Sequence, residues 1–256
     1  MRVASASSTS STLKSSPLPH IVLFAGLACI VSRTSARKDI LTSTMFILDM
    51  IENPVFGICW ITTIMFSICL HEYAHAITAL KCGDDTAASQ GHLSLNPAIQ
   101  MGGMSILFLF LIGIAWGAVP VNESRMRHRL HPALVAFAGP LSNLILCALF
   151  ALAWTAIHTM APQLDHAKYF LGIGSLVNGT LFCLNMLPIP PLDGWTVLAG
   201  FVPRMKHLSP QVLQNISFLL IALMLFGALR FVSKGGEVIS GFFYTVFGYV
   251  ARLFLQ

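Results

Sequence analysis

Two histidines four residues apart flank an acid in the stretch His71-Glu72-Tyr73-Ala74-His75. On a helix, positions i and i+4 share a face, so both imidazoles can bind one Zn²⁺ at about 2.0–2.1 Å. Glu72 is displaced around the helix from the histidines. From there it can act as a general base on a zinc-bound water without binding the metal itself. The spacing therefore predicts a hydrolytic zinc site with Glu72 as its catalytic residue.

A catalytic zinc ion takes three protein ligands and keeps one position for water, so a third ligand is needed. The strongest remaining residue is Asp193, which follows three prolines in the stretch 187–194. Prolines interrupt a helix, and irregular backbone at membrane depth is tolerated where it lines a protein or water cavity. An ordinary Asp-Gly turn remains an alternative for Asp193, and His92 is a rival ligand.

Two asparagines, Asn143 and Asn185, also fall inside long apolar runs. Hydrogen bonding between helices is a common use of such side chains in membranes. A role in binding the substrate or an oxyanion is the other interpretation, and the sequence alone favours neither.

The composition places these residues in a membrane protein. Of 256 residues, 55% are hydrophobic and only 10% are charged, whereas soluble domains carry about 25% charged residues. The uncharged runs are long enough to span a bilayer as helices, and they lack the alternation of a β-barrel. No concentrated basic face with aromatic residues is present, so we expect no binding to nucleic acid.

The runs and connections predict an all-α polytopic membrane protein with about six transmembrane helices. Residues 1–17 are rich in Ser and Thr and are expected to be disordered. The expected organisation continues with a first span and connection (18–53), a zinc metalloprotease membrane core (54–202) and C-terminal transmembrane helices (203–256). Within the core, Pro54 and Gly83 predict the start and end of the helix that carries the histidines.

A geometric argument predicts that 99–120 is a re-entrant segment. One zinc ion requires His71, His75 and Asp193 at the same depth, so an even number of crossings should separate them. Three apolar runs lie between them: 99–120, 132–161 and 169–187. The first has the most glycines, and it is therefore the run expected to fold back.

The chain resembles the site-2 protease family of intramembrane zinc metalloproteases. The resemblance covers about 54–200 and is carried by three stretches, 71–75, Ala138-Gly139-Pro140-Leu141-Ser142-Asn143 and 185–194. It implies that His71, His75 and Asp193 bind one zinc ion and that Glu72 is the catalytic acid and base. It also implies a substrate contact for Asn143.

Two further stretches, 91–97 and 120–122, resemble the short prokaryotic branch of that family, which lacks a PDZ domain. That branch usually has Arg where this chain has His92. The resemblance implies a multi-pass protein of the bacterial inner membrane.

The predicted function is hydrolysis of peptide bonds in or near the transmembrane segments of membrane proteins, with the lipid bilayer as the surrounding medium. A metal or ion transporter is one alternative, although such proteins usually show inverted repeats with broken helices in both halves. A catalytically silent membrane scaffold is another, although it would be expected to have lost Glu72 or a ligand.

Overall fold

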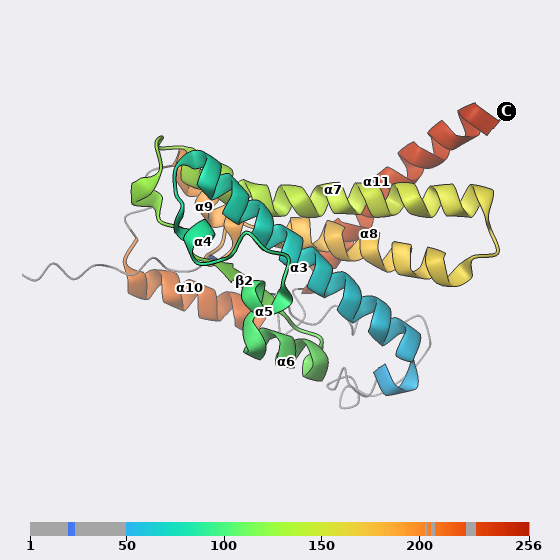
Figure 1. Cartoon of the computed structure of the whole chain (residues 1–256), viewed down its shortest axis with the longest axis horizontal. Coiled ribbons are helices and arrows are strands. Elements are labelled where there is room, and N and C mark those ends of the chain that lie inside the picture. Colours follow the sequence, from blue (N-terminus) through green and yellow to red (C-terminus); the bar gives the residue numbers. More distant parts are fainter. Residues whose placement is uncertain (1–19, 24–49, 203, 206–207, 224–228, 256) are drawn as a thin grey trace, which may run out of the picture.

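The computed structural model describes residues 20–23, 50–202, 204–205, 208–223 and 229–255. Helices dominate this part of the chain, which confirms the helical class (Figure 1). Residues 1–17 and most of the expected first span lie outside the described residues, so the proposed domain boundaries stay predictions. Three of the described helices are long and apolar enough to cross a membrane, α3 (Pro54–Cys82), α7 (His131–Met160) and α8 (Asp165–Asn185).

The ends of α3 follow from the residues that flank it. The side chain of Asn53 accepts a hydrogen bond from the backbone N–H of Phe56, and Pro54 occupies the first turn. At the other end, Gly83 adopts φ +106°, a left-handed conformation that favours glycine and lets its N–H bond back to the last turn. Both predicted boundaries of this helix are confirmed.

Long helices pack around α7. α8 returns alongside α7, α3 packs against α7, and α11 (Leu229–Leu255) packs against both α7 and α8 (Figure 1). The short helix α9 (Asp193–Phe201) follows the proline-rich stretch and also packs on α7. α10 (Pro210–Leu223) lies between α9 and α11 in the chain. The site therefore forms where α3, α7 and α9 meet.

The segment 99–120 is broken into short elements. They are α5 (Pro97–Gln100), α6 (Gly102–Ile112) and β2 (Trp116–Val119). One short helix, α4 (Thr86–Ser89), precedes them, and another, η3 (Glu123–Arg125), follows them. The 11 residues of α6 rise only about 16 Å, roughly half the thickness of a bilayer core. After α6 the chain reverses at Gly113, and the hydroxyl of Ser105 donates to the carbonyl of Trp116 at 2.6 Å. The chain therefore folds back within 99–120, and its re-entrant placement in a membrane stays a prediction.

A small sheet was not predicted. β1 (His20–Leu23) pairs antiparallel with β2, with His20 opposite Val119 and Leu23 opposite Trp116. β2 also packs on α3, so this sheet lies on the helix that carries the two histidines.

The connection that follows α3 contacts the connection that follows β2. Arg125 forms an ion pair with Asp85 at 2.6 Å, and the backbone N–H of Asn122 donates to the buried carboxylate of Asp84 at 2.7 Å. The N–H of Arg127 donates to the carbonyl of Cys82 at 3.1 Å. Segments in direct contact must lie on the same side of a membrane.

Single cysteines placed in 86–95 and in 123–130 are therefore expected to react with an impermeant thiol reagent from the same face. The measurement uses intact cells and inverted vesicles, in a background from which the native cysteines have been removed. Labelling of the two segments from opposite faces would contradict the fold-back.

Candidate metal centre

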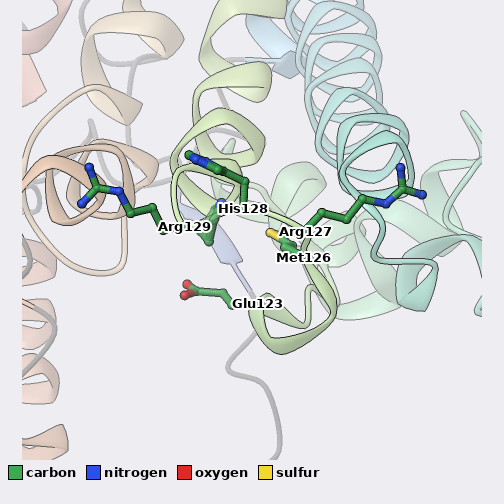
Figure 2. Close-up of a pocket in the computed structure, with 6 residues that line it drawn as sticks. Glu123, Met126, Arg127, His128 and Arg129 are labelled. Atoms are coloured by element: carbon green, nitrogen blue, oxygen red, sulfur yellow. The ribbon is translucent and has the colours of Figure 1, made fainter.

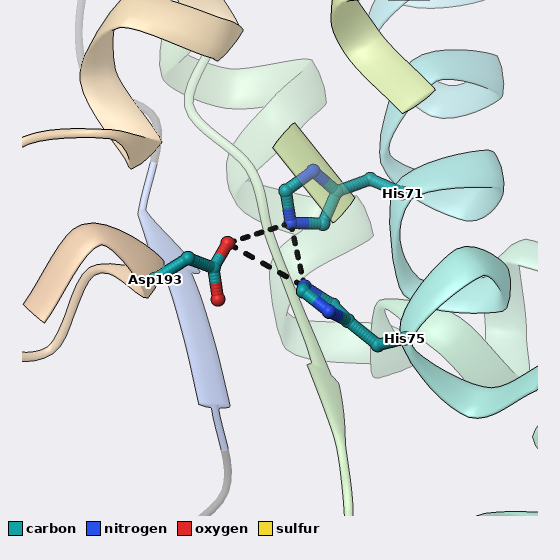
Figure 3. A group of neighbouring side chains, drawn as sticks. All are labelled: His71, His75 and Asp193. Atoms are coloured by element: carbon teal, nitrogen blue, oxygen red, sulfur yellow. Dashed lines mark hydrogen bonds and ion pairs between the residues drawn. The ribbon is translucent and has the colours of Figure 1, made fainter. Parts of the chain in front are cut away.

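Three buried side chains converge at the junction of α3 and α9. Nε2 of His71 and Nε2 of His75 are 2.9 Å apart, and Oδ2 of Asp193 lies 3.1 Å from the first and 3.4 Å from the second. Figure 3 shows the two imidazoles on one face of α3 with the carboxylate pointing at both. Tetrahedral ligands at about 2.0–2.2 Å from one ion stand about 3.3–3.6 Å apart. The donor atoms thus converge at nearly the separation that one small cation requires.

The second nitrogen of each imidazole is held by a carbonyl oxygen. Nδ1 of His71 lies 2.6 Å from the side-chain oxygen of Asn143, and Nδ1 of His75 lies 2.7 Å from the backbone oxygen of Val135. Each oxygen accepts a hydrogen bond, so the neutral ring carries its proton on Nδ1 and presents the Nε2 lone pair to the centre. This is the usual arrangement around metal-binding histidine.

When both imidazoles are neutral, two lone pairs and one carboxylate therefore face one another with no hydrogen between them. Acceptors at 2.9–3.4 Å repel unless a cation lies among them. Two imidazoles and one carboxylate are also a known catalytic zinc set. The residues of this centre fit zinc.

Glu72 lies beside this group but outside it. Its side chain is buried, and neither carboxylate oxygen has a hydrogen-bond partner among the described residues. The strand β2 passes directly over it: a Cβ built on Gly117 would fall closer to Oε1 of Glu72 than real atoms come. An unpartnered buried carboxylate next to a metal set is suited to taking a proton from water.

Glycine also lets the backbone of α7 approach the histidines. A Cβ on Gly139 would collide with Nε2 of both His71 and His75. The next residue, Pro140, lies inside the helix and has no N–H to donate. The Ala138-Gly139-Pro140 stretch thus permits the close contact between α7 and α3 at the site.

The change Gly139→Ala is expected to displace an imidazole and weaken zinc binding by at least about tenfold, the lower end of what changes around a metal's ligands cost. Competition with a chromogenic chelator measures this affinity. The matched control is Gly103→Ala in α6, where a Cβ meets nothing within 4 Å. Equal zinc affinity in the two variants would contradict the proposed crowding.

The remaining residues predicted from the sequence lie as follows. Asn143 is within the site and contacts His71, while Asn185 is buried at the end of α8 with its side-chain oxygen unpartnered among the described residues. His92 lies outside the group of three and pairs instead with Gln100, 3.2 Å from Nδ1 to Oε1. Asp193 is the first residue of α9 and does not belong to a free turn.

Sequence reasoning missed Asn178, which is buried on α8 and bonded to Asn143 at 3.0 Å. A polar amide in an apolar helix was the only available signal.

A separate hollow of about 260 Å³ lies in the basic connection before α7. Its lining is Glu123, Met126, Arg127, His128, Arg129 and Pro132. Figure 2 shows the side chains of Arg127 and Arg129 pointing away from one another. The hollow offers no convergent set of ligands and is not a second centre of the same kind.

Comparison with known proteins gives relatives of one kind. The chain is 36% identical over 150 residues to YwhC of Bacillus subtilis, a match that spans 56% of this chain and 68% of YwhC. It is 33% identical over 176 residues to Rip2 of Mycolicibacterium smegmatis, spanning 63% of this chain and 64% of that protein. It is 35% identical over 156 residues to Rip2 of Mycobacterium tuberculosis, spanning 57% of this chain and 56% of the relative.

The chain thus covers about two thirds or less of these relatives. Their names assign all of them to the zinc metalloproteases. No family model and no solved structure matches the chain. A metal set of two histidines and an aspartate beside a free glutamate agrees with those names, and the chain belongs to the site-2 protease family of zinc metalloproteases.

Proposed function

We propose that this chain is an intramembrane zinc endopeptidase that cleaves membrane proteins in or near their transmembrane segments. One observation carries the proposal. Glu72 has no hydrogen-bond partner among the described residues and lies on α3, a helix of membrane-spanning length, beside the convergent His71, His75 and Asp193. If Glu72 had a purely structural role, an ion pair would satisfy its carboxylate. A hydrolase needs a carboxylate that is free to accept a proton.

The chain's own residues have distinct roles in the proposed reaction. His71, His75 and Asp193 would hold one zinc ion per chain. Zinc, when bound, would supply Lewis-acid polarisation of the scissile carbonyl and acidify water. Glu72 accepts the proton of the attacking water and delivers it to the leaving amine, a task typically worth about 10²–10⁴-fold in rate.

Two asparagines are proposed to contact the substrate. The side-chain oxygen of Asn185 is buried without a partner among the described residues, while its nitrogen donates to the carbonyl of Leu181 at 3.0 Å. An acceptor held in this way is suited to receive an N–H of an unwound substrate. The contact from Asn143 stays a prediction, since the structure shows that residue bonded to His71 and Asn178.

The bilayer sets a condition on the substrate. The carbonyl groups of a transmembrane helix are bonded within the helix, so the segment must unwind before a peptide bond can be attacked. Gly or Pro in the substrate lowers that cost. We place the enzyme as a multi-pass protein of the bacterial inner membrane, on the strength of its apolar helices and its bacterial relatives.

The test is an unbiased cleavage screen. The purified full chain is reconstituted with zinc in proteoliposomes that also contain bacterial inner-membrane proteins, and new peptide termini are identified by mass spectrometry. We expect termini in or next to transmembrane segments, abolished by a chelator and restored by zinc. Zinc uptake into the vesicles without any new termini would favour a transporter. If neither new termini nor zinc uptake were observed, a silent scaffold would be favoured.

A further inference from the structure

A chain of buried polar side chains leads from α8 to the metal centre. Ser67 lies on α3, Asn178 on α8 and Asn143 on α7, and all three are inaccessible to solvent. Asn178 donates to the hydroxyl of Ser67 at 2.9 Å, Asn143 donates to Asn178 at 3.0 Å, and Asn143 accepts from His71 at 2.6 Å. Four side chains from three helices thus form one connected network.

The direction of every bond in this network follows from one backbone carbonyl. The side-chain nitrogen of Asn178 lies 2.9 Å from the carbonyl oxygen of Gly174, which can only accept. The reverse orientation of this amide would set two oxygens against each other, so the Asn178 oxygen must face Asn143. That oxygen in turn requires the nitrogen of Asn143, which leaves the oxygen of Asn143 facing Nδ1 of His71.

We propose that Asn178 is a positioning residue of the metal centre, acting through Asn143 to fix His71 as the tautomer protonated on Nδ1. This inference rests on the proposed zinc site. The Nε2 lone pair is then aimed at the other two ligands before any metal arrives. His75 needs no such device, because its Nδ1 is held directly by the backbone oxygen of Val135. The network gives His71 the orientation that a carbonyl of α7 gives His75.

The arrangement has a physical advantage for a ligand whose Nδ1 is bonded to a side chain and not to the backbone. A single asparagine could rotate its amide by half a turn and present nitrogen to His71, which would favour the wrong tautomer. Bonding to Asn178 forbids that rotation, because Asn178 is itself locked by Gly174. Partners of metal-bound histidine commonly change metal affinity by about 10–100-fold when they are replaced.

The first experiment measures zinc affinity by chelator competition in Asn178→Leu, Asn143→Leu and the double variant of the full chain. Asn178→Leu is expected to weaken binding by about 10–100-fold. If Asn178 acts through Asn143, the double variant should bind zinc no more weakly than Asn143→Leu alone. The matched control is Thr155→Val, which removes a buried hydrogen bond to Ala151 on α7, outside the network, and should leave zinc affinity unchanged.

Full multiplication of the two single effects, or unchanged affinity in Asn178→Leu, would overturn the relay. A loss of affinity in Thr155→Val as large as that in Asn178→Leu would also overturn it, because the effect would then be general to the bundle.

A second measurement reads the tautomer itself. In protein labelled with ¹⁵N-histidine, the ring signals of His71 are identified by their absence from His71→Ala. Metal-free wild-type protein should show the proton on Nδ1, and Asn178→Leu should show a mixture of tautomers. A proton on Nε2 in the wild-type protein would overturn the inference even if Asn178→Leu failed to fold. Absence of zinc binding by the wild-type protein would count against the proposed function, whereas the tautomer would still test the relay.

Discussion

Replacement of Glu72 by glutamine is expected to abolish proteolysis while zinc stays bound. Glutamine has the size of glutamate but cannot accept a proton, so the loss should reach about 10²–10⁴-fold or fall below detection. The metal should remain because Glu72 is not among the three converging ligands. Cleavage of a substrate found in the proteoliposome screen and the zinc content of the same preparation are measured together.

The matched control for this change is Glu123→Gln, which makes the same chemical substitution on an exposed acid in η3. It should retain full activity. Normal turnover by Glu72→Gln would remove Glu72 from the mechanism and reopen the transporter interpretation.

Replacement of a zinc ligand should remove the metal, whereas Glu72→Gln should retain it. His71→Ala and His75→Ala each remove one of three donors, and each leaves the buried carboxylate of Asp193 short of a partner. Zinc affinity should fall more than the approximately 100-fold upper range seen for residues that only support a ligand. Metal analysis of the purified protein after gel filtration measures the zinc that remains.

His92→Ala is the informative control, because His92 was the rival ligand on sequence grounds. It pairs with Gln100 in the structure, and its replacement should leave the zinc content unchanged. Undiminished zinc in both His71→Ala and His75→Ala would rule out the site, and zinc loss confined to His92→Ala would assign the metal elsewhere.

The sequence predicted those features of the fold that depend on residues close together in the chain. The helix that carries the histidines begins at Pro54 and ends before Gly83 as expected, since capping involves only groups within a few residues. The shared face of His71 and His75 follows from helical periodicity alone. Asp193 was found by a different route, because a charge at the edge of an apolar region requires partners.

Features that depend on distant contacts could not be predicted in this way. His20–Leu23 belongs to an apolar run in the sequence, and only its pairing with β2 makes it a strand. Asn143 was an isolated amide in the sequence and Asn178 was missed, because their common orientation depends on a contact between α7 and α8 and on the carbonyl of Gly174. Of about six expected spans, three described helices meet the length and composition of a span. The run 99–120 divides into short elements, and most of the expected first span lies outside the described residues.

The separation of the ligands along the chain determines when the metal centre can form during translation. His71 and Asp193 are 122 residues apart, which at about 5–20 residues per second corresponds to roughly 6–24 s of translation. During that interval the helix carrying His71, His75 and Glu72 has left the ribosome, but the third donor has not been made. A nascent chain at this stage holds only two of its three ligands. The centre of His71, His75 and Asp193 therefore cannot be complete until most of the polypeptide has been synthesised.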